Sequence, residues 1–211
     1  MAKGYSSRKA NLRKQITKIL LICEGQKTER IYFGRYRARN NGLEILTPKT
    51  NVTDPKNLVK FALSQIQKYG IDFQYGDQVW CVFDADKNTL QNISDASKLA
   101  QKNNINLCLS NPCFELWYLL HYIYYDQRIS TKDLLEKLTK NILNYTKSKD
   151  YFDILVNNRN NAMKNAIKLN KKHSDLGVEL LSLASNPSTL VVQIVQEILE
   201  IISKNKNKLI V

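Results

Sequence analysis

Four short apolar runs divide the first half of the chain, and each has the length of a buried β-strand. They span residues 18–23, 43–47, 78–83 and 105–109. Runs that are apolar at nearly every position are typical of strands covered on both faces, as in a parallel sheet. Helical patterns separate the four runs, so the sequence predicts an α/β fold in which strands and helices alternate.

Helix signals lie between these runs and continue to the end of the chain. Asp54 and Pro55 have the residue types favoured at an N-cap and at the first helical position, and Gly70 is a typical helix stop. Beyond residue 130 the pattern is wholly helical. Helices are expected at 29–39, 54–69, 94–103, from 111 onward, from 130 onward, and at 157–173 and 188–204, with a loop at 184–189.

The order of these elements predicts the organisation of the chain. Residues 16–125 are expected to form a four-stranded, mostly parallel sheet flanked by helices. Residues 126–211 are expected to form a helical C-terminal region that packs on it. Residues 1–15 carry basic side chains and no acid, so they are predicted to be a basic N-terminal arm. At 211 residues, the chain is long enough for one sizeable core.

The chain is strongly basic: 32 Lys and Arg residues against 19 Asp and Glu residues give a formal net charge of +13. Such an excess favours a polyanionic partner, above all a nucleic acid, although a genome biased toward Lys, Asn and Ile would produce a similar excess. The predicted arm is the most basic part. Its candidate nucleic-acid contacts are Lys3, Arg8, Lys9, Arg13 and Lys14.

No apolar stretch approaches the length of a membrane span, and the basic N-terminus lacks the apolar core of a signal peptide. Cys23, Cys81 and Cys108 lie in or beside apolar runs, which is typical of reduced core residues. A cytoplasmic protein without a membrane partner is therefore expected.

Carboxylates follow the predicted strands at the points where the strands end. Asp84 and Asp86 close the third run and are two residues apart, so in an extended chain their side chains point to the same side. Glu24 follows the first run, and Glu115 lies just beyond the fourth. The carboxyl ends of parallel strands share one edge of a sheet, where sites form. Like charges held together need a cation or a proton, so the sequence predicts a Mg²⁺-type site.

Some of these acids and their neighbours have simpler explanations. Glu29 and Glu115 fall in first turns of predicted helices, where an acid favours the helix dipole. Lys27 and Lys87 flank the acids and would offset phosphate charge, unless they are ordinary solvated lysines. His121 shares a helix face with aromatic residues, which is typical of a packed histidine.

A strand followed by Glu-Gly, and later a strand followed by Asp-x-Asp, resembles TOPRIM domains of topoisomerases, primases and OLD-family nucleases. The wider pattern resembles the RloB-like family of compact TOPRIM-like proteins linked to phage defence or restriction loci. The stretches that carry this resemblance are 21–29, 82–86, 110–117 with Leu120-His121, and 186–189.

The resemblance implies a TOPRIM-like core and a Mg²⁺- or Mn²⁺-dependent endonuclease acting on DNA or RNA. It implies Glu24 as general acid, general base or metal ligand, Asp84 and Asp86 as metal ligands, and Glu115 as part of a second metal position. Many OLD-type members have an acid where Thr28 stands. Glu29 is one position further along, so it is at most an accessory residue, as is His121. An AAA-type, ABC-like ATPase partner is also implied, while homo-oligomerisation stays open.

Two other function classes remain alternatives. Residues 84–88, Asp-Ala-Asp-Lys-Asn, resemble the nucleophile loop of haloacid-dehalogenase-like phosphatases, but Asn88 replaces the usual Thr or Val. The same stretch begins like an EF-hand loop, yet Thr89 stands where glycine is required. The second alternative class is a protein without catalytic activity: a nucleic-acid-binding subunit that regulates an ATPase complex.

Overall fold

A five-stranded, mostly parallel sheet forms the centre of the protein in the computed structural model, which describes residues 16–37 and 42–207. The strand order is β2-β1-β3-β4-β5. The four parallel strands are β1 (Thr17–Cys23), β2 (Leu43–Leu46), β3 (Gln78–Asp84) and β4 (Asn106–Asn111). The predicted α/β fold is therefore confirmed. The five cations of the predicted N-terminal arm lie outside the described residues.

One strand was not predicted. β5 (Ser188–Thr189) has two residues and pairs antiparallel with the end of β4. The two hydroxyl side chains of Ser110 and Thr189 are 2.8 Å apart across this pair. Because Ser188 and Thr189 belong to the sheet, the last helix, α8 (Val191–Asn207), begins after them and not at residue 188.

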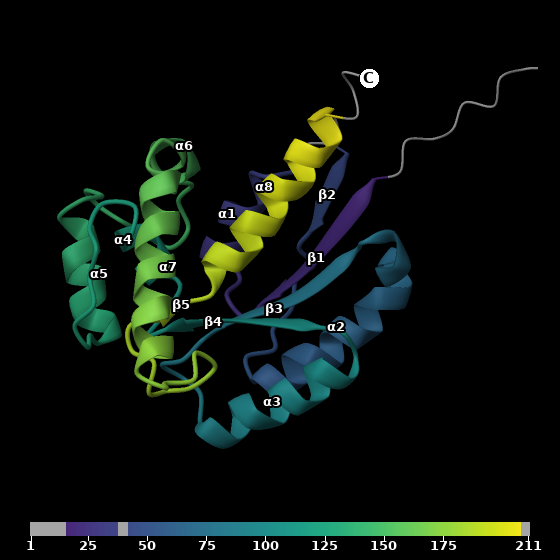
Figure 1. Ribbon diagram of the computed structural model, residues 1–211, viewed down its shortest axis with the longest axis horizontal. Helices are drawn as coiled ribbons and strands as arrows, with labels where there is room; N and C mark the ends of the chain where they lie inside the picture. The colour runs from purple at the N-terminus through teal and green to yellow at the C-terminus, as the bar shows by residue number, and fades with distance from the viewer. Residues whose placement is uncertain (1–15, 38–41, 208–211) are drawn as a thin grey trace, which may run out of the picture.

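Helices cover both faces of the sheet (Figure 1). α2 (Pro55–Tyr69) and α3 (Leu90–Lys102) pack together on one face, against β1, β3 and β4. α1 (Thr28–Gly34) and α8 lie on the other face. The central strands β1 and β3 are therefore buried on both sides, which explains why their sequences are continuously apolar.

The remaining α-helices lie together beside the edge of the sheet that β4 and β5 form (Figure 1). They are α4 (Glu115–Leu119), α5 (Thr131–Thr139), α6 (Phe152–Val156) and α7 (Arg159–Asp175). Tyr32 of α1 contacts the rings of Phe114, Trp117 and Phe152, so aromatic packing joins this group to the sheet layer. Within the described ranges, no helix has both the length and the apolar character that crossing a membrane requires.

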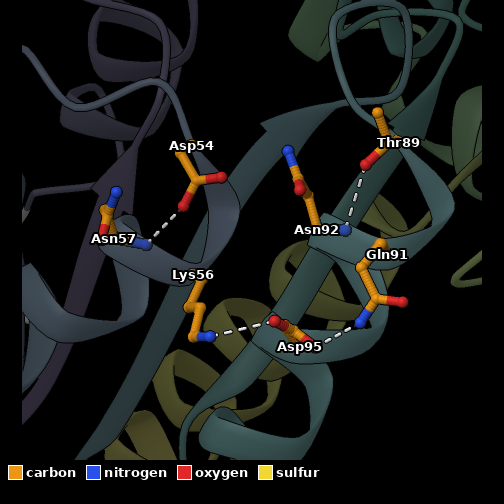
Figure 2. A network of polar contacts seen from close by, with 7 residues as sticks. All are labelled: Asp54, Lys56, Asn57, Thr89, Gln91, Asn92 and Asp95. Carbon is orange, nitrogen blue, oxygen red and sulfur yellow. Dashed lines mark hydrogen bonds and ion pairs between the residues drawn. The ribbon is translucent and has the colours of Figure 1, made fainter.

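A polar network holds the N-terminal ends of α2 and α3 beside each other (Figure 2). Asp54 caps α2 and Thr89 caps α3, each accepting a hydrogen bond from the backbone amide three residues on, at 2.8 and 3.2 Å. Lys56 Nζ lies 2.9 Å from Asp95 Oδ2 and joins the two helices. The Thr89 cap starts α3 at Leu90, earlier than predicted, and keeps the loop after β3 short.

We expect Thr89→Ala to lower the free energy of unfolding by about 1 kcal/mol, because it leaves an amide of the first turn of α3 without its acceptor. Thr89→Ser retains the hydroxyl and should stay close to wild type. Urea denaturation of the three proteins measures the difference. Equal stability of the Ala and Ser variants would show that the cap contributes nothing.

Candidate active site

The carboxyl ends of the two central strands bring Glu24 and Asp84 together. Glu24 follows β1 directly, and its backbone amide still donates to Val82 O of β3 at 2.8 Å. Its side chain accepts a hydrogen bond from the backbone amide of Asp84 through Oε2, at 3.2 Å. Asp84 Oδ1 in turn accepts from the amide of Phe114, at 2.9 Å. Backbone amides therefore fix both carboxylates and join the ends of β1 and β3 to the segment that follows β4.

Glu115, the first residue of α4, is 1% exposed and meets two residues from a distant segment. Tyr145 donates its hydroxyl to Glu115 Oε1 at 2.9 Å, and Lys147 Nζ lies 3.2 Å from the same oxygen. The hydroxyl of Thr28 also donates to the carbonyl of Lys147, at 3.0 Å. The segment between α5 and α6 is therefore held over the acids and brings a cation to them.

Glu29 is 5% exposed and lies against Gly25. A Cβ atom on residue 25 would stand 2.0 Å from Glu29 Oε2, far inside any allowed contact. Glycine at position 25 is therefore what lets the Glu29 carboxylate lie where it does. Its place in the first turn of α1 also suits the helix dipole, as expected, but its side chain turns inward to the other acids.

These side chains line one cavity of about 310 Å³ at the edge of the sheet. Four carboxylates and three ammonium groups share it. Its lining comprises Glu24, Gly25, Gln26, Lys27, Thr28, Glu29, Thr53, Asp84, Lys87, Glu115 and Lys147. The cavity thus joins most of the predicted site residues that the structure describes, and both flanking lysines lie on it.

Burial and mutual repulsion raise the pKa values of three acids of the cavity, Glu24, Glu29 and Asp84. The pKa of Glu29 is raised to about 7, first by burial and then by the charges of Glu115 and Glu24. Burial also raises the pKa of Glu24, and it raises that of Asp84 well above its usual range, with further repulsion from Glu29 and Glu115. Burial lowers the pKa of Lys147, but the combined attraction of Glu115, Cys113 and Asp84 outweighs this effect and the net shift is upward. The cluster therefore favours a proton or a cation.

Two carboxylate oxygens in the cavity wall have no partner among the residues that the structure describes. Glu24 Oε1 and Glu115 Oε2 are buried and accept no hydrogen bond from residues 16–37 or 42–207. Hard divalent cations take carboxylate oxygens as ligands, so the residue types and these two free oxygens fit Mg²⁺ or Mn²⁺. In the part of the chain that the structure describes, no three His, Cys, Asp or Glu side chains converge closely enough to hold a metal ion as they stand.

Asp86 does not line this cavity. β3 ends at Asp84, and the next two amides bond to Ser110 O and Pro112 O, so the strand-like alternation between positions 84 and 86 stops there. The exposed Asp86 side chain accepts from the hydroxyl of Thr131 at 2.9 Å and lines a neighbouring cavity. The structure thus separates the two aspartates that the sequence suggested would point to one side.

His121 lies in the protein interior and not on the cavity. Its Nδ1 is 2.8 Å from Trp117 O, and its ring meets the Trp117 ring edge-on. Burial lowers its pKa to about 4, so the imidazole is neutral at neutral pH. It is packed, as the sequence favoured.

Sequence reasoning missed Tyr145, Lys147 and Thr53. Lys147 lies in a stretch without hydrophobic periodicity or motif, more than thirty positions from Glu115. Its contact depends on how the segment between α5 and α6 folds back. No local pattern signals this.

Comparison with known proteins places the chain in a family. A family model described as RloB-like protein matches residues 19–198. Because this span covers most of the chain, the protein belongs to the RloB-like family, in agreement with the resemblance seen in the sequence. Neither a search of curated proteins nor a search of solved structures found a match.

In protein stripped of divalent cations, we expect stability to fall as the pH rises from about 4.5 to about 7, since Glu29 keeps its proton in the folded state over the range where the unfolded chain loses it. The slope from this group is at most about 1.4 kcal/mol per pH unit. Urea denaturation at several pH values measures it. Glu29→Gln should reduce the slope, whereas Glu136→Gln, an exposed control on α5, should not. An unchanged slope in Glu29→Gln would contradict the assignment.

Proposed function

We propose that this RloB-like protein is a divalent-metal-dependent endonuclease that hydrolyses phosphodiester bonds in DNA or RNA, with a TOPRIM-like core. The observation that carries this proposal is the cavity where four carboxylates and three lysines meet at the ends of parallel strands. Carboxylates that are buried together suit a cation, and lysines beside them suit a phosphate. A strongly basic chain suits a polyanionic substrate.

In this proposal Glu24, Asp84 and Glu115 hold Mg²⁺ or Mn²⁺, whereas the predicted ligand Asp86, which lines the neighbouring cavity, is not assigned to the metal. The bound ion would supply Lewis-acid stabilisation of the phosphate and a more acidic water. Lys27, Lys87 and Lys147 bind non-bridging phosphate oxygens.

Proton transfer in the proposed reaction falls to the acids of the cavity. Glu29 lies in the cavity beside the three proposed metal ligands and is not one of them, so it is the candidate general acid or base. The family resemblance gives Glu24 as the alternative general acid or base, in place of its role as a metal ligand.

The wider setting rests on the family resemblance. It supports a cytoplasmic role in anti-phage defence or restriction, with an AAA-type, ABC-like ATPase as partner. The basic segment at residues 1–15 would add affinity for nucleic acid that depends on salt and not on sequence.

We expect wild-type protein with Mg²⁺ or Mn²⁺ to cleave at least one of plasmid DNA, single-stranded DNA and total tRNA. Asp84→Asn and Glu24→Gln should lower the rate by more than about 100-fold, because each removes a negative oxygen from the cavity. Glu136→Gln should cleave as wild type does. Calorimetric titration with Mn²⁺ measures metal binding independently.

The outcomes separate the function classes. Mn²⁺ binding without cleavage of any substrate, also when the ATPase partner is added, would favour the non-catalytic regulatory subunit. Turnover of a small phosphate ester without cleavage of nucleic acid would favour the phosphatase. If the wild-type protein neither binds Mn²⁺ nor cleaves any of the substrates, the proposal is refuted.

A further inference from the structure

We propose that the second cavity, on the other side of the turn formed by Asp84–Lys87, is a nucleotide subsite. It takes the nucleoside next to the scissile phosphate and binds the adjoining phosphate through Arg128. This inference rests on the proposed function, because it takes the substrate to be a nucleic acid with a phosphate in the acidic cavity.

The two cavities share the turn as a common wall. Asp84 and Lys87 line the acidic cavity, whereas Ala85 and Asp86 line the second one. The amides of Ala85 and Asp86 bond to Ser110 O and Pro112 O, so the turn is fixed to the end of β4. If one phosphate of a polynucleotide lies in the acidic cavity near Asp84, the neighbouring nucleotide across the turn therefore reaches the second cavity.

The second cavity has the size and the surface for a nucleoside. Its volume is about 400 Å³, within the usual range of ligand sites. Pro112, Ile129 and Leu183 contribute apolar surface to its walls. Bases have two apolar faces and are recognised by packing of this kind together with polar contacts at their edges.

The two asparagines in the wall are occupied in holding the cavity open. Asn186 bonds to both the amide and the carbonyl of Ile129, at 2.9 and 3.0 Å, and donates to Asn111 Oδ1 at 3.0 Å. The side-chain amide of Asn111 donates to the carbonyls of Ser182 and Leu183. These bonds tie β4, the segment before α5 and the segment before β5 together. The cavity is therefore preformed.

Two charged groups are left for a ligand. Arg128 is exposed, is the only cationic residue of the lining, and makes no ion pair or hydrogen bond within the described residues. Asp86 accepts from Thr131 through Oδ2, while Oδ1 accepts no hydrogen bond from the described residues. A guanidinium suits a phosphate, and a free carboxylate oxygen suits an N–H group on a base edge.

The test is a binding titration, with Ca²⁺ replacing Mg²⁺ so that the probe is not cleaved. The probes are fluorescein-labelled single-stranded DNA and RNA of mixed sequence, each of about ten nucleotides. Arg128→Ala should weaken binding about tenfold, the loss expected for one charge-assisted contact. Lys132→Ala removes the same charge from a nearby exposed position of α5 that does not line the cavity, and should weaken binding less than about twofold.

A second variant tests shape without changing charge. Leu183→Trp fills the cavity and should also weaken binding about tenfold, since a base stacked or packed in such a site contributes at least this much. Thermal unfolding checks that this variant folds, and Arg128→Ala decides the question if it does not. Equal losses for Arg128→Ala and Lys132→Ala, or unchanged binding to folded Leu183→Trp, would overturn the subsite.

The same variants keep this inference apart from the nuclease proposal. Cleavage that depends on Asp84, together with wild-type binding by Arg128→Ala and Leu183→Trp, would refute the subsite and leave the nuclease intact. The expected losses of binding in a protein that cleaves nothing would support the subsite and refute the catalytic proposal. Failure of wild type to bind either probe would overturn the subsite.

Discussion

Repulsion among buried carboxylates is the main constraint on this structure, and other parts of the fold offset it. Four acids share one cavity, and burial of unpaired charge is among the most costly features of a folded protein. The fold offsets the cost with backbone amides, which bond Glu24 and Asp84, and with Tyr145 and Lys147, which bond Glu115. Two carboxylate oxygens still have no partner within the described part of the chain. A sheet buried on both faces supplies the rigidity that keeps such groups together.

The C-terminal region completes the site and does more than cover the sheet. Its segment between α5 and α6 brings Tyr145 and Lys147 onto the acids, and Thr28 holds that segment in place. On the other side of the turn after β3, Ile129 and Leu183 of the same region help to enclose the second cavity. Residues from both halves of the chain therefore form each of the two cavities.

The sequence predicted what depends on local pattern, and it could not predict what depends on distant packing. The apolar runs located the parallel strands, and chain order was enough to place Glu24, Asp84 and Glu115 at one edge. β5 is two residues long, too short for any periodicity to show, and its pairing partner lies far away in sequence. The direction of the Asp86 side chain depends on where β3 ends, which composition alone does not fix. Lys147 reaches Glu115 only through tertiary folding.

The contact between Gly25 and Glu29 has a consequence for how such a site can change over time. Residue 25 has no side chain, and the space that a methyl group would occupy is filled by the oxygens of an acid four positions later. The two positions therefore compete for one volume. A single alanine at residue 25 would expel the Glu29 carboxylate and redistribute the charge of the cavity, although every acidic codon stayed intact. Substitutions at these two positions should accordingly be interdependent during evolution.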